Sequence, residues 1–93
     1  MFLGYTQTDK LSCIEYRDNY ESKDECESKD ECDLYIEITK LKDEREMNVR
    51  ICIEKYTGGQ DIIYRGDYNL MEPNIKLLVE KKLYDELIYR KFL

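Results

Sequence analysis

Two stretches in the middle of the chain alternate apolar and polar residues with a period of two, the pattern of a strand with one buried face. The apolar positions are Leu34, Ile36 and Ile38 in the first stretch and Val49, Ile51 and Ile53 in the second. A polar segment at 43–46 separates them and suits a hairpin loop. A four-residue loop pairs Ile38 with Ile51, whereas a two-residue loop pairs Ile38 with Val49. Both registers place the six aliphatic side chains on one face, because they differ by an even step.

A second hairpin is predicted around the Gly-Gly pair at residues 58–59. Glycine is favoured at the two central positions of a tight hairpin turn because both need positive φ. Counting outward from a two-residue turn pairs Ile53 with Tyr64. Ile62 and Tyr64 are therefore expected to join the aliphatic face.

The segment after Pro73 is long and rich in helix-forming residues. It predicts a C-terminal helix over about 74–92, with Asn74 as the N-cap. Its apolar residues spread widely around a helical wheel, so a strand at Ile75–Val79 followed by a shorter helix at Tyr84–Phe92 remains the alternative. In either form this segment is expected to cover the aliphatic face.

An earlier strand is predicted at residues 10–17, with Ile14 and Tyr16 facing inward and its position in the sheet open. Together these elements predict an α+β domain, in which an antiparallel sheet of about four strands carries a C-terminal helix packed on one face. The expected organisation is a single domain over residues 1–93, with an acidic loop at 18–33 and hairpins at 34–56 and 48–65.

Composition adds a local charge to this picture. The 93-residue chain has a net charge of −6, and residues 21–33 hold seven acids against two lysines, which leaves little net charge elsewhere. We call residues 21–33 the acidic segment. Direct binding to nucleic acid is disfavoured, because phosphate contacts require clustered Lys and Arg. No apolar run approaches the roughly 20 residues of a membrane span, and a cytoplasmic location is expected, without membrane attachment.

The acidic segment contains a perfect tandem repeat, ESKDEC-ESKDEC, at residues 21–32. It offers no apolar side for packing, so it is expected to be an exposed loop. One interpretation is a solvated insertion without a function; the other is an anionic patch that docks on a basic surface of another protein. Flanking tyrosines would support docking, because tyrosine is enriched at interface hot spots. The predicted partner-binding residues are Tyr20, Glu21, Asp24, Glu25, Glu27, Asp30, Glu31, Asp33 and Tyr35.

The residue inventory argues against most chemistry. The chain has no histidine, which removes the commonest general base and the imidazole ligands of catalytic metals. No phosphate-binding glycine loop is present, and no catalytic residue or cofactor is predicted. The cysteines are Cys13, Cys26, Cys32 and Cys52, without the closely spaced pair of a zinc knuckle, so no metal ligand is assigned. A Cys26–Cys32 disulfide is a hypothesis for an oxidising environment.

The leading hypothesis is a non-enzymatic, acidic protein-binding module that occupies a basic, nucleic-acid-binding surface of its partner. In size and charge the chain resembles the small inhibitors with which phages and mobile elements block host nucleic-acid machinery, such as anti-CRISPR and anti-restriction proteins. That resemblance implies a viral protein acting in the host cytoplasm. The alternatives are a structural domain that oligomerises and a thiol- or metal-binding domain.

Overall fold

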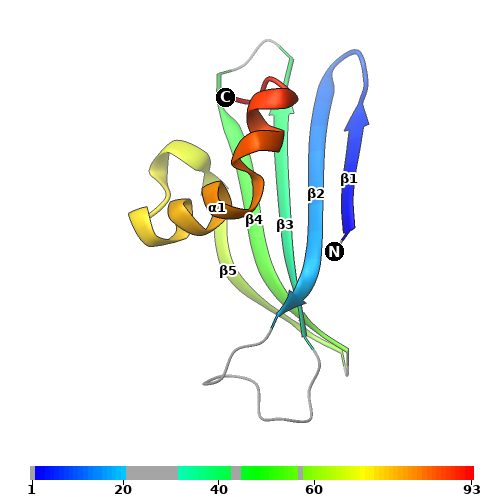
Figure 1. Cartoon of the computed structure of the whole chain (residues 1–93), viewed down its shortest axis with the longest axis vertical. Helices are drawn as coiled ribbons and strands as arrows, with labels where there is room; N and C mark the ends of the chain where they lie inside the picture. Colours follow the sequence, from blue (N-terminus) through cyan, green and yellow to red (C-terminus); the bar gives the residue numbers. More distant parts are fainter. Residues whose placement is uncertain (1, 21–31, 43–44, 57) are drawn as a thin grey trace.

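The computed structural model describes residues 2–20, 32–42, 45–56 and 58–93. These residues form five strands, a short 3-10 helix and one α-helix, namely β1 (Phe2–Gln7), β2 (Leu11–Tyr20), β3 (Cys32–Leu41), β4 (Met47–Lys55), β5 (Gln60–Asp67), η1 (Tyr68–Leu70) and α1 (Pro73–Tyr89). The strands make one antiparallel sheet in the order β1-β2-β3-β4-β5, and α1 lies across one face of it (Figure 1). The α+β class is confirmed, with five strands rather than about four.

The additional strand is β1, which the sequence pattern missed. It pairs with β2 without interruption, from Phe2 opposite Arg17 to Gln7 opposite Ser12. The residues of β1 show weak alternation because an edge strand needs only partial burial of one side, and here Leu3 and Tyr5 are half-buried. The predicted strand at 10–17 is confirmed as part of β2, and its place in the sheet is between β1 and β3.

The β3–β4 pairing confirms the predicted aliphatic face and selects one of the two registers. Ile38 lies opposite Val49 and Ile36 lies opposite Ile51, as the two-residue loop requires. Leu34, at the other end of β3, lies opposite Ile53. The side chains on this face are buried. The prediction that the six aliphatic residues share the buried face in either register is therefore confirmed.

The predicted β4–β5 register is wrong. Tyr64 lies opposite Ile51 instead of Ile53, and the ladder shifts between Ile51 and Cys52. This bulge reverses the alternation beyond it, so Ile62 lies opposite Cys52 and is 57% exposed rather than on the aliphatic face. Gly58 and Gly59 do adopt positive φ, as expected, but within a turn longer than two residues.

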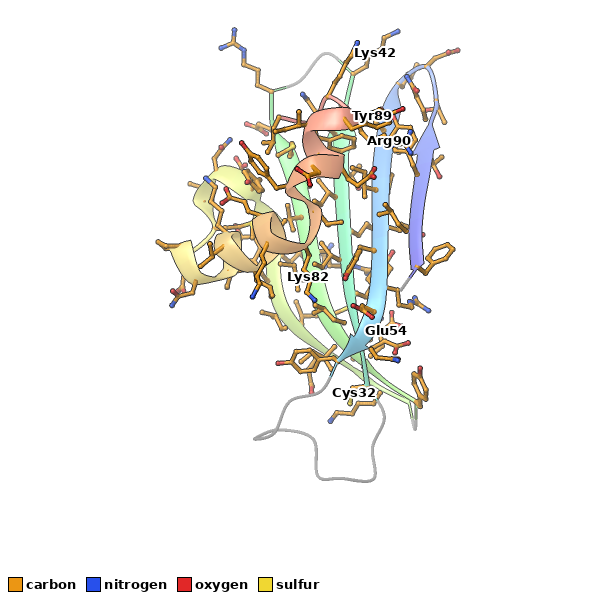
Figure 2. The ribbon with its side chains drawn as sticks, viewed as in Figure 1. Cys32, Lys42, Glu54, Lys82, Tyr89 and Arg90 are labelled. Atoms are coloured by element: carbon orange, nitrogen blue, oxygen red, sulfur yellow. The ribbon has the colours of Figure 1, made fainter. Side chains whose placement is uncertain are left out.

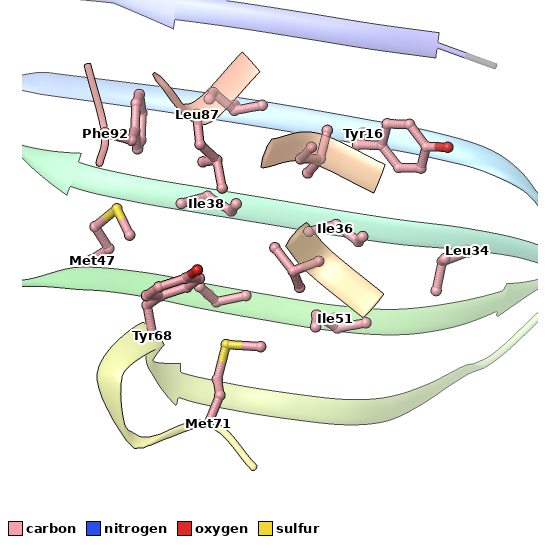
Figure 3. Packing of buried hydrophobic residues seen from close by; sticks show 14 residues of the cluster. Tyr16, Leu34, Ile36, Ile38, Met47, Ile51, Tyr68, Met71, Leu87 and Phe92 are labelled. Atoms are coloured by element: carbon pink, nitrogen blue, oxygen red, sulfur yellow. The ribbon is translucent and has the colours of Figure 1, made fainter. Parts of the chain in front are cut away.

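The core lies between α1 and the face of the sheet that α1 covers, which we call the inner face (Figure 3). The sheet contributes five of the six predicted aliphatic residues, all except Ile53, together with Ile14, Tyr16 and Met47. The helix contributes Val79, Leu83 and Leu87, which recur at helical spacing. The two layers therefore exclude water from one continuous cluster.

α1 runs without a break, so the alternative of a strand at 75–79 is excluded. The helix begins at Pro73, with Glu72 at the N-cap, and the prediction of Asn74 as N-cap is wrong. Proline suits the first helical position because its missing N–H would have no partner there and its φ is already helical. None of the helices in the described part of the chain has the length and apolar character needed to cross a membrane.

Candidate functional site

The strands on either side of the acidic segment are neighbours in the sheet. β2 ends at Tyr20 and β3 begins at Cys32, and these two residues lie opposite each other in the ladder. Residues 18–20 and 32–33, predicted as loop, thus belong to strands. β2 and β3 extend further than predicted because their backbone groups form hydrogen bonds to each other even where the side chains are polar. Tyr20 and Cys32, which flank residues 21–31, consequently lie at the same end of the sheet.

The structure separates the predicted partner-binding residues that it describes. Tyr20 packs partly against the inner core, whereas Asp33 and Tyr35 lie on the opposite face of the sheet, which we call the outer face. The side chain of Asp33 accepts a hydrogen bond from the hydroxyl of Tyr56 at 3.0 Å. The remaining predicted residues, Glu21, Asp24, Glu25, Glu27, Asp30 and Glu31, lie outside the described residues.

Tyr35 is the centre of a polar network on the outer face. Its ring lies beneath two guanidinium groups, with the Arg17 carbon 5.1 Å and the Arg50 carbon 5.5 Å from the ring centroid. Its hydroxyl donates a hydrogen bond to Glu37 at 2.8 Å. These neighbours leave only 7% of the residue exposed. The ring therefore contacts its own sheet and offers little area to a partner.

This environment favours the neutral form of Tyr35. Burial raises the pKa of its hydroxyl, and the hydrogen bond to Glu37 and the negative charge of that carboxylate raise the pKa further. The hydroxyl is therefore held as a hydrogen-bond donor at neutral pH and is unsuited to act as a base.

Three cations near the end of the sheet at which β3 begins each contact a carboxylate. Figure 2 labels one of these cations, Lys82, together with Glu54 and with Cys32, the first residue of β3. The ion pairs are Arg17 with Glu54 at 3.2 Å, Lys55 with Asp61 at 3.4 Å and Lys82 with Asp18 at 3.9 Å. Ion pairs this exposed contribute little to stability. The negative charges that neutralise these three cations thus come from acids outside residues 21–31.

Within the described residues, one group of potential metal ligands lies on the outer face. The ligand atoms of Cys13, Glu15 and Glu37 are within 4.8 Å of one another. Burial raises the pKa of the Cys13 thiol; a hydrogen bond from Thr39 opposes that shift, and the two carboxylates add to it. The neutral thiol is thus favoured, whereas a metal requires the thiolate. Glu37 is in addition already the acceptor for Tyr35.

The cysteines that the structure describes do not converge on one site. Cys13 and Cys52 lie on the outer face in different cross-strand rows, and Cys32 lies on the inner side of the sheet. Cys52 is fully buried, and burial raises its pKa. These positions do not favour a shared tetrahedral ion. The hypothesis of a Cys26–Cys32 disulfide involves Cys26, which lies outside the described residues.

A small groove of about 270 Å³ lies between α1 and the first two strands. Leu3 and Tyr16 line it from the sheet, and residues 80–86 line it from the helix. The sequence reasoning did not find this groove, because it depends on how α1 is placed on the sheet. Pockets for small substrates are commonly larger, at roughly 300–1,000 Å³.

Comparisons with known proteins found no family model, no curated protein and no solved structure with a significant match to this chain. A functional assignment consequently depends on the chemistry of the residues themselves.

Proposed function

We propose that the chain is a non-enzymatic protein-binding module whose acidic segment docks on a basic surface of a partner protein. The observation that carries the proposal is the concentration of charge. Residues 21–33 hold seven of the 21 acids of the chain but only two of its 15 cations. A charge this local raises the rate of encounter with an oppositely charged surface and disfavours wrong partners.

The sheet supports this role because it fixes the positions of the residues that flank 21–31. Tyr20 and Cys32 are paired in the ladder, so the segment is held at both ends by neighbouring strands. The strands themselves are fixed by a continuous core on the inner face. A rigid support of this kind reduces the conformational entropy that is lost when the segment binds.

The charge of the segment also suggests the class of partner. Closely spaced carboxylates can occupy a surface that evolved to bind the phosphates of nucleic acid, because both are anionic hydrogen-bond acceptors. The partner we propose is accordingly a nucleic-acid-binding protein, and the effect of binding is inhibition by competition. This mode of action is the one expected of the phage-type inhibitors that the chain resembles in size and charge.

The test compares two variants with equal net charge. In the first, the acids Asp24, Glu25, Glu27, Asp30 and Glu31 are replaced by Ser. In the matched control, five exposed acids elsewhere, namely Asp9, Glu15, Glu46, Glu72 and Asp85, are replaced by Ser. Each immobilised protein is exposed to host lysate at low and at high salt, and the captured proteins are quantified.

We expect the parent and the control to retain the same basic protein at low salt, and the first variant to lose it. The captured protein, once purified, should lose binding to its nucleic acid when the parent is added. Equal retention by the first variant, or a partner that keeps its nucleic acid in the presence of the parent, would contradict the proposal.

A further inference from the structure

The two edge strands of the sheet differ in their protection against pairing with another strand. The β5 edge carries Asp61, Arg65 and Asp67 and contains the bulge next to Ile63. Charges and bulges on an edge strand are devices that prevent pairing between molecules. β1 has neither, since its sequence FLGYTQ contains no charged residue and no proline and its pairing with β2 is unbroken.

The turn after β1 shows which backbone groups face the open edge. The amide of Thr8 donates to the carbonyl of Leu11 at 2.8 Å, so Thr8 directs its backbone groups toward β2. In an antiparallel ladder this orientation alternates along the strand. Leu3, Tyr5 and Gln7 therefore direct their N–H and C=O groups away from β2. β1 lies at the edge of the sheet (Figure 1), so no strand in the described part of the chain pairs with these groups.

We propose that this edge binds β1 of a second copy of the chain, forming a two-fold symmetric dimer with one continuous ten-stranded sheet. The two-fold axis passes between the two Tyr5 residues, and Leu3 lies opposite Gln7 of the other copy. This register matches every outward N–H of these three residues with a carbonyl. It also keeps the inner faces of the two sheets continuous, because residues 3, 5 and 7 share one face.

Charge favours a second copy as the occupant. A two-fold axis brings each edge strand against its own sequence, so a charged strand repels itself, whereas β1 has no charged residue. The one cation on the ring of Tyr5, the guanidinium of Arg90 at 4.3 Å, is paired with Glu86 at 3.5 Å. The net charge of −6 opposes association of two copies. Antiparallel pairing reduces this repulsion, because Tyr20 and Cys32, which flank residues 21–31, lie at the end of the sheet where β2 pairs with Phe2. These flanking residues of the two copies thus lie at opposite ends of the dimer.

The dimer would change what the proposed docking function can do. Pairing through β1 uses neither Tyr20 nor Cys32, the residues that flank 21–31, so two partner molecules could be bound at once. Two binding sites on one particle increase the apparent affinity for a partner that is itself multivalent. The dimer itself does not depend on the docking proposal, since it rests on the backbone groups and the composition of β1.

The first test is carried out on the unmodified chain. Sedimentation across a concentration series should show a species of twice the 11.3 kDa monomer mass. Amide hydrogen exchange by NMR should show protection of Leu3, Tyr5 and Gln7 that increases with protein concentration. A monomer mass at every accessible concentration, or a dimer in which these three amides exchange as fast as in the monomer, would overturn the proposal.

The second test uses a pair of substitutions at the two-fold axis. Tyr5→Pro removes an N–H that points to the open edge and leaves the hydrogen bonds between β1 and β2 in place. Tyr5→Phe retains both that N–H and the ring. We expect Tyr5→Phe to remain a dimer and Tyr5→Pro to be a folded monomer. A Tyr5→Pro variant that dimerises like the parent would overturn the proposal; if that variant does not fold, the exchange experiment on the parent decides.

Discussion

Ile36 and Tyr35 are adjacent in β3 and both are buried, yet they lie on opposite faces of the sheet and are buried by different means. Ile36 is covered on the inner face by α1 and by aliphatic neighbours. Tyr35 lies on the outer face, beneath the side chains of Arg17 and Arg50. Ile36 is thus shielded from water by a second layer of secondary structure, and Tyr35 is shielded by long polar side chains from adjacent strands.

The difference matters for what each face can do. The inner face stabilises the fold and cannot be uncovered at low cost, because exposing its aliphatic side chains to water is unfavourable. The outer face keeps charged groups at the surface while hiding an aromatic ring and the thiol of Cys52. It therefore remains in contact with water, and the groups around Tyr35 are mainly charged, whereas the exposed Ile62 lies opposite Cys52.

The largest expected effect is on the inner face. Ile36→Ala should lower the free energy of unfolding by about 2–5 kcal/mol, because it leaves a cavity in a packed core. Ile36→Val, as the control, should cost about 0.5–1.5 kcal/mol. Urea denaturation of both variants measures these values. A cost for Ile36→Ala no larger than that for Ile36→Val would show that α1 does not pack closely on this face.

The next effect is on the outer face. Tyr35→Leu should cost about 1–3 kcal/mol, since it removes the two cation–π contacts and leaves Glu37 without the tyrosine hydroxyl. Tyr35→Phe keeps the ring and should cost only about 0.5–1.5 kcal/mol. The same denaturation experiment applies. If Tyr35→Leu were neutral, the guanidinium groups would not be stabilised by the ring, and the proposed means of closing this face would be wrong.

The smallest effect is a dependence on high pH that involves both faces. Burial, followed by a hydrogen bond to Glu80 and the charge of that carboxylate, raises the pKa of Tyr68 on the inner side to about 12, and the pKa of Tyr35 is also raised. The folded state thus favours the protonated phenols. Their contribution to stability is complete below about pH 10 and is lost as the pH rises through the folded-state values.

Each tyrosine should then reduce the stability by at most about 1.4 kcal/mol per pH unit above about pH 10. Denaturation midpoints measured from neutral to alkaline pH test this expectation. Tyr68→Phe and Tyr35→Phe should each flatten the decline, and Tyr89→Phe, at an exposed position, should not. An unchanged slope in both buried variants would mean that these hydroxyls are solvated in the folded protein.

Part of the fold could be predicted because the sequence alternates apolar and polar residues with the period of a strand. Ile36, Ile38, Val49 and Ile51 had to share a face, since a strand with a period of two can bury only one side. The β4–β5 register could not be predicted in this way. The bulge next to Cys52 depends on how the twisted strands pair, and it moved Ile62 to the surface although its residue type suggested the interior.

The candidate site was predictable to a smaller extent. The charge of the acidic segment is a property of the sequence, and so is its position between two strands. That Tyr20 and Tyr35 lie on opposite faces depended on the actual extent of β2 and β3, which continue to Tyr20 and from Cys32. The groove beside Leu3 depended on the placement of α1.

By itself, the sequence determined the α+β class, the aliphatic face and the location of the charge, because periodicity and charge are local properties that need no knowledge of distant contacts. Only the tertiary structure decided that β1 forms an edge of the sheet, that Tyr35 is closed by Arg17 and Arg50, and that Ile62 is exposed. Each of these depends on which strands are neighbours and in what register. Pairing between residues far apart in the chain is set by the packing of the whole domain.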